Sequence, residues 1–185
     1  MRESNNNALA KKKSDDDLRK RRPIFILENQ LMDTLELQWH VHQAGVRLSE
    51  IGDAKIEALF DGLTAELRMF IDTIHARLQS LRKEGPHLVE WTSSSFWRLF
   101  AKDDVNGFSQ FEALVYGYAH YAKQTSKAIA NLDVMGDSES ANLLKRIFNA
   151  TDRCLWFVEI YMEGFALNVD SCGLPDWPID NAADK

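Results

Sequence analysis

The chain has few of the residues that mark several large protein classes. Of its 185 residues only two are cysteine, four are proline and nine are glycine. Two cysteines are too few for a disulfide framework in a chain of this length, which favours a reducing compartment such as the cytoplasm. No apolar run approaches the ~20 residues of a membrane span, and the amino terminus lacks the apolar core of a signal peptide. We therefore expect a protein that is neither membrane-spanning nor exported.

Acidic residues outnumber basic ones over the whole chain but not at its start. The formal net charge of -6 argues against a globally cationic nucleic-acid binder. The first 22 residues, however, hold eight basic side chains against four acidic ones, together with three consecutive asparagines. This composition predicts a flexible, net-basic arm over residues 1–23. At the other end, residues 169–185 form an acidic, proline-containing tail without periodicity, for which we expect largely irregular structure.

Helical periodicity is what the sequence has in abundance. In the first predicted helix, from Ile24 to about Ile51, one side is expected to carry Leu27, Leu31, Leu35, Gln38, His42 and Val46. Apolar residues at the same spacing predict further helices over residues 56–81, 108–132 and 137–165, with a hinge around 50–53 and a turn over 133–140. A short helix is expected within residues 92–100. This order predicts an all-α, ferritin-like four-helix bundle over residues 24–168, with the short helix in the connection between helices 2 and 3.

Three of these stretches resemble the Dps family of bacterial mini-ferritins. The similar residues are Leu31, Asp33, Leu35, Leu37, Gln43 and Ala44 in the first stretch, Leu59, Phe60, Asp61, Asp72, Thr73, Arg77 and Leu81 in the second, and Gly136 to Glu159 in the third. The resemblance spans about residues 27–164. It implies a hollow shell of twelve identical subunits in the bacterial cytoplasm or nucleoid. Such a shell oxidises Fe(II) with peroxide or oxygen, stores the iron and protects DNA.

The positions that should bind iron depart from the family. Its iron pair lies between two subunits, bound by two histidines of one chain and by an Asp and a Glu of the other. The matching positions here are Gly45, Glu57, Asp72 and Ala76, so only the aspartate is retained. Val46 also stands where a Trp usually follows the first histidine. The resemblance therefore implies that the ferroxidase centre is altered.

Nearby side chains suggest a displaced metal site. His42 precedes Gly45 by one helical turn, and His75 follows Asp72 by three residues. The candidate ligands for iron, or for another divalent metal such as zinc, are His42 and Glu57 from one subunit and Asp72 and His75 from its partner. A five-residue insertion after Gly45 would instead place His40 at the family position. On spacing alone, Asp72 and His75 fit a solvated polar face equally well, and His42 fits a hydrogen-bonded core residue.

Two charged groups are further functional candidates. DNA-backbone contacts are expected from the arm through Lys11, Lys12, Lys13, Arg19, Lys20, Arg21 and Arg22, with avidity from many copies. The resemblance places Asp133, Asp137 and Glu139 in the turn that lines iron-entry pores. The same carboxylates fit capping of the helix that follows, since they precede or begin it.

Two rival interpretations remain open. One is a shell without ferroxidase activity that packs DNA or only assembles, which Gly45 and Ala76 favour. The other is a bundle with a metal site inside each subunit, for which inward carboxylates are available at Glu36, Glu66, Glu112 and Glu159. The second rival is the weaker one, because the fourth helix lacks the Glu-x-x-His pair that such sites use.

Overall fold

The computed structural model describes residues 2–82, 107–167 and 173–178, with side chains described from residue 22 onward. These residues form four long helices and one short 3-10 helix, without any strand. The elements are α1 (Arg2–Leu48), η1 (Ser49–Ile51), α2 (Ala54–Arg82), α3 (Gly107–Met135) and α4 (Ser138–Ala166). They confirm the predicted all-α four-helix bundle. The short helix predicted within residues 92–100 lies outside the described residues.

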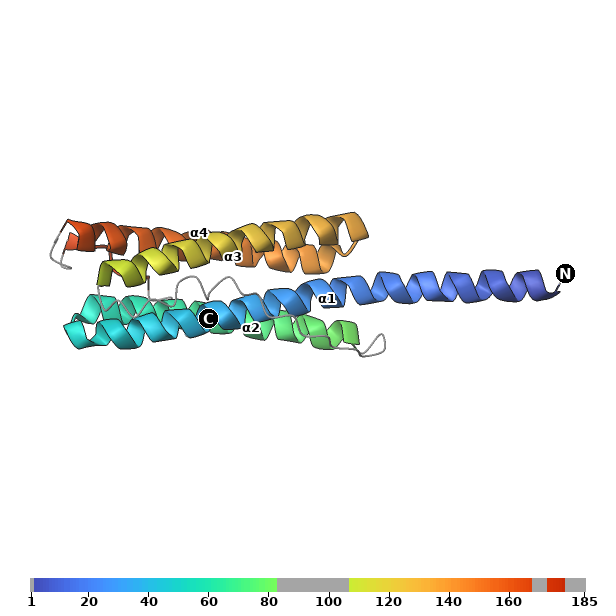
Figure 1. Cartoon of the computed structure of the whole chain (residues 1–185), viewed down its shortest axis with the longest axis horizontal. Helices are drawn as coiled ribbons and strands as arrows, with labels where there is room; N and C mark the ends of the chain where they lie inside the picture. Colours follow the sequence, from blue (N-terminus) through green and yellow to red (C-terminus); the bar gives the residue numbers. More distant parts are fainter. Residues whose placement is uncertain (1, 83–106, 168–172, 179–185) are drawn as a thin grey trace, which may run out of the picture.

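The helices form two antiparallel pairs that lie side by side (Figure 1). α1 pairs with α2, and α3 pairs with α4. α1 also packs along α3, whereas α2 and α4 contact each other less extensively. Apolar side chains from all four helices meet between the pairs and form one continuous core.

α1 begins well before the start that periodicity predicted. The sequence placed its first residue near Ile24, whereas the helix runs from Arg2. Its first part projects past the ends of the other three helices in Figure 1. Pro23 lies inside α1, where it removes one backbone hydrogen-bond donor. The arm is therefore helical here, while its flexibility and the boundaries at residues 23 and 168 stay predictions.

The hinge between α1 and α2 lies where the sequence placed it. Gly52 adopts a left-handed conformation with φ of 70° after η1, a conformation that glycine tolerates without strain. The Asp53 carboxylate then accepts the backbone N–H groups of Lys55 at 2.9 Å and Ile56 at 3.4 Å. These bonds satisfy free donors at the first turn of α2, so the chain reverses over very few residues.

The turn between α3 and α4 is shorter than predicted. α3 continues to Met135, Gly136 takes a left-handed φ of 79°, and α4 starts at Ser138. Asp137 caps α4, because its Oδ1 accepts the Ser140 N–H at 3.1 Å. Capping by Asp137 was one of the two roles expected for this residue.

The predicted apolar face of α2 is confirmed, but that of α1 is wrong. Ile56, Leu59, Leu63, Leu67 and Ile74 are all buried as expected. Of the face predicted on α1 only Leu27 is fully buried, and the rest of the buried face consists of Gln30, Thr34, Leu37, Val41, Ala44 and Leu48. The predicted residues Leu35, His42 and Val46 are exposed. The core of α1 was missed because two of its members are polar and are buried with hydrogen bonds to α3.

Candidate metal site and the outer face of the first helix pair

All four predicted metal ligands are exposed on the first helix pair. His42 lies on α1, while Glu57, Asp72 and His75 lie on α2. His42 is therefore a surface residue and not the core histidine that its periodicity allowed. Asp72 and His75 are three residues apart in a continuous helix, so their side chains share one face.

One chain does not bring the four ligands together. Glu57 and Asp72 are fifteen positions apart on α2, which corresponds to about 22 Å along a helix. His42 and Glu57 lie toward the hinge, and Asp72 and His75 lie toward the other end of α2. In the described parts of the chain, no three His, Cys, Asp or Glu residues group closely enough to hold a metal. Any site made from these residues needs a second subunit.

Gly45, which the resemblance matched to a histidine, packs closely against α2. A Cβ built on Gly45 would lie 3.2 Å from three atoms of Phe60 on α2. This distance is tighter than ordinary van der Waals contact, so a histidine here would require the Phe60 ring to shift. The two helices therefore approach closely at this point.

Large apolar side chains are exposed on the same helix pair as the candidate ligands, and we call the two sets together the outer face. It consists of the exposed residues Phe25, Leu35, Trp39, Val46 and Met69 with the four candidate ligands. Trp39 is 58% exposed, Val46 55% and Met69 55%. On α1 these positions lie opposite the core residues Leu37 and Val41 in helical register. Exposed apolar groups of this size, interspersed with polar ones, are typical of a surface that a partner covers.

The other described histidines are partly buried. The ring of His40 packs edge-on against Trp39 with centroids 4.8 Å apart, and burial lowers the pKa of His40. His120 on α3 contacts Gln124, and its pKa is lowered by burial and then by Lys127 and Lys123. A lowered pKa keeps both imidazoles neutral near pH 7, the form that binds metals. His87 lies outside the described residues.

The three predicted pore carboxylates all have cationic partners within the subunit. Arg77 Nη2 contacts Asp137 Oδ1 at 3.0 Å, and Arg77 Nη1 contacts Glu139 Oε2 at 2.7 Å. Lys145 pairs with Asp133 at 3.2 Å. Arg77 also donates to the Ser140 hydroxyl at 2.9 Å. Sequence reasoning noted Arg77 only as part of the resemblance, because nothing local reveals that it reaches a turn sixty residues away.

The four glutamates considered for a metal site inside each subunit are not all buried. Of the four only Glu66 is buried, and Arg153 binds it in an ion pair. Glu112 is exposed, and Glu36 and Glu159 are half-buried. Beside Glu66, burial and the neighbouring carboxylate raise the pKa of Cys154 to about 12. Glu66 is thus engaged by an arginine, and a protonated thiol is a poor metal ligand.

The candidate DNA-binding side chains are described only at Arg22, which is exposed. The other six belong to the first part of α1, whose side chains lie outside the described ones. In the described residues no helix is long and apolar enough to cross a membrane.

Comparison with known proteins resolves the fold. No family model matches the chain, and no curated protein sequence does. Among solved structures, a point mutant of Dps1 from Mycobacterium smegmatis superimposes with a TM-score of 0.64 at 18% identity. The match covers 79% of this chain and 98% of that one. The chain has a Dps-like fold. The predicted ferritin-like bundle is confirmed. A shared fold does not fix the chemistry of the outer face, which depends on the residues that this chain carries there.

Proposed function

We propose that the chain is the subunit of a Dps-like mini-ferritin. In this proposal twelve copies form a hollow shell that sequesters iron, and Fe(II) is oxidised by peroxide or oxygen at a modified site between subunits. The ligands are His42 and Glu57 of one subunit with Asp72 and His75 of the next. The proposed setting is the cytoplasm or nucleoid.

One observation carries the proposal. The candidate ligands are exposed on the same helix pair that carries the apolar side chains of the outer face, so one partner surface would cover both. Covering the face removes apolar area from water and brings ligands from two chains together. A carboxylate and imidazole set suits Fe(II), which takes borderline and hard ligands. The Dps-like fold supports the same arrangement.

The test is anaerobic Fe(II) titration followed by peroxide or air, with Fe(III) formation tracked by absorbance. Asp72→Ala and His75→Ala should each slow oxidation by roughly tenfold or more, since each removes a metal ligand. Asp152→Ala, an exposed carboxylate on α4, is the matched control and should match the unmodified protein. Oxidation at the protein-free rate in every sample would contradict the proposal.

A shell without ferroxidase activity is the second candidate. It is favoured by Gly45 and Ala76, which stand where the resemblance places a histidine and a glutamate. This candidate expects assembly without saturable Fe(II) binding. The same titration, combined with sizing of the particle, separates the two functions.

DNA association through the arm is tested separately. Lys11, Lys12 and Lys13 replaced together by Gln should weaken binding by roughly tenfold or more and flatten its salt dependence, because fewer counterions are released. Replacement of Lys123 and Lys127 on α3 by Gln is the control, since both are exposed on the bundle. Equal DNA affinity in both variants would remove the arm from the proposal.

A further inference from the structure

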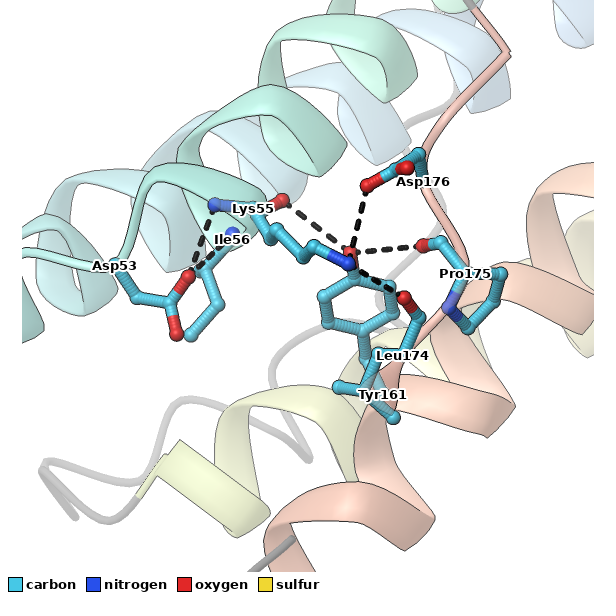
Figure 2. Close-up of polar contacts among 7 residues, drawn as sticks. All are labelled: Asp53, Lys55, Ile56, Tyr161, Leu174, Pro175 and Asp176. Atoms are coloured by element: carbon cyan, nitrogen blue, oxygen red, sulfur yellow. Dashed lines mark hydrogen bonds and ion pairs between the residues drawn. The ribbon is translucent and has the colours of Figure 1, made fainter. Parts of the chain in front are cut away.

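Residues 173–178 lie across the junction between α2 and α4 (Figure 2). The Lys55 ammonium at the start of α2 donates to the Leu174 carbonyl at 2.7 Å and pairs with Asp176 at 3.1 Å. From α4, the Tyr161 hydroxyl donates to the Pro175 carbonyl at 3.1 Å. Two side chains from different helix pairs thus hold two consecutive carbonyls of the segment.

Two glycines make room for the side chains of this segment. A Cβ on Gly62 of α2 would lie 2.2 Å from Trp177 Nε1, and one on Gly164 of α4 would lie 2.9 Å from Leu174 Cδ2. Trp177 also packs on Phe157 with ring centroids 4.9 Å apart. Glycine is disfavoured in a helix interior, so both positions are explained by what sits on them. Leu174 and Trp177 are the apolar anchors of the segment.

We propose that the residues of α2 and α4 that contact this segment, which we call the groove, form a peptide-binding site for a Leu-Pro-Asp-Trp sequence, which the C-terminal segment of the same chain occupies. The groove consists of Lys55, Gly62, Phe157, Tyr161 and Gly164. Every described contact comes from Leu174 to Trp177, through two apolar anchors, two carbonyls and one carboxylate. Pro175 and Pro178 restrict the backbone, which lowers the entropy lost on docking. Attachment to α4 supplies a high effective concentration.

The consequence is a latch between the two helix pairs. α2 and α4 contact each other less extensively than the members of either pair, and the segment contacts both. The occupied groove therefore holds α1–α2 against α3–α4. This inference does not depend on the proposed iron chemistry.

The groove is tested in the full-length chain by the effect of Gly62→Ala on the melting temperature, which should change sign when Trp177 is replaced. In the unmodified protein Gly62→Ala should lower the melting temperature, because its Cβ displaces Trp177. In a Trp177→Ala background the same change should raise it by about 2–4 °C, because alanine favours the helix. Ala58→Gly on the exposed side of α2 is the control and should lower stability equally in both backgrounds. An effect of Gly62→Ala with the same sign and size in both would overturn the proposal.

Binding in trans tests the same site directly. A fluorescein-labelled peptide of residues 173–178 is titrated with the full-length Trp177→Ala chain and followed by anisotropy. Saturable binding to the Trp177→Ala chain is expected. The unmodified chain should bind the peptide at least tenfold more weakly, because its groove is already filled. The Gly62→Ala/Trp177→Ala chain should not bind it. Equal anisotropy changes with all three proteins, or no change with any, would overturn the peptide site.

Discussion

Two buried tyrosines one helical turn apart on α3 differ in the hydrogen bonding of their hydroxyl groups. The Tyr121 hydroxyl lies 2.8 Å from Thr34 Oγ1, whereas the Tyr118 hydroxyl has no hydrogen-bond partner in the described part of the chain. Burial raises the pKa of Tyr121 to about 12 and raises that of Tyr118 well above its ordinary value, so both are neutral phenols. A buried hydroxyl without a partner lowers stability, while a bonded one is nearly neutral or stabilising.

The pair gives a prediction with its own control. Tyr118→Phe should raise the free energy of unfolding by about 1 kcal/mol, because it removes an unsatisfied polar group. Tyr121→Phe should lower it by about 1 kcal/mol, because the Thr34 hydroxyl loses one of its two hydrogen bonds and keeps only the one to the Gln30 carbonyl. Urea unfolding of the two variants measures both changes. A loss of stability in both would mean that Tyr118 has a partner after all.

Asp33 on α1 gives a pH-dependent prediction. Burial raises the pKa of its carboxyl from 3.8 to about 6. Between these values the folded chain binds the proton more tightly than the unfolded chain, so this residue's contribution to stability falls as pH rises through the window. Asp33→Asn should therefore stabilise the protein at pH 7 by about 1 kcal/mol, a figure reduced for partial exposure, and not at pH 4. Urea unfolding at both values checks this, with exposed Asp152→Asn as control.

At the scale of elements, the sequence predicted the position and buried face of a helix best where the helix carries a single apolar stripe. α2 and α4 have such a stripe, and their positions were predicted closely. α1 carries two stripes that both contain apolar residues, and the one with Leu35 and Val46 is exposed. The buried stripe contains Gln30 and Thr34, whose hydrogen bonds to Thr125 and Tyr121 exist only after α3 has packed. Such tertiary bonds leave no periodic signal in the sequence.

The same limit applies to the candidate site. Spacing predicted that Asp72 and His75 share a face, which follows from the helix alone. It did not predict that Arg77 engages the α3–α4 turn or that Trp177 rests on Gly62, because both contacts join distant parts of the chain. Local patterns fix a helical face, and packing decides what covers it.

Arg77 gives a prediction about the α3–α4 turn. The Arg77 and Asp137 side chains are only 12% and 13% exposed. Arg77→Met should destabilise the fold by about 3 kcal/mol, because it leaves a largely buried carboxylate without its counter-charge. Lys145→Met breaks the half-exposed pair with Asp133 and should cost less than about 1 kcal/mol. Thermal unfolding of both variants provides the comparison, and equal losses would assign Arg77 no special role.

At the scale of the whole molecule, the outer face and the latch differ in whether one chain covers their apolar side chains. The latch is satisfied within one chain, since its anchors already contact α2 and α4. The apolar side chains of the outer face are not covered within one chain, since Trp39, Val46 and Met69 each keep more than half of their surface exposed. Under the proposed function, association uses the α1–α2 side, which carries the candidate ligands, and leaves the latch intact.

Trp39→Glu tests this division. A carboxylate at the centre of the outer face would have to be desolvated without a counter-charge when a partner covers it, so the variant should fail to form the shell. Light scattering should then give a mass near that of one 21.2 kDa chain, against about twelve such chains for the unmodified protein. Ser126→Glu, an exposed position on α3, is the control and should assemble normally. Because Trp39 is already exposed, the helical content and melting of the isolated subunit should change little. A complete shell from the Trp39→Glu variant would show that assembly uses another surface.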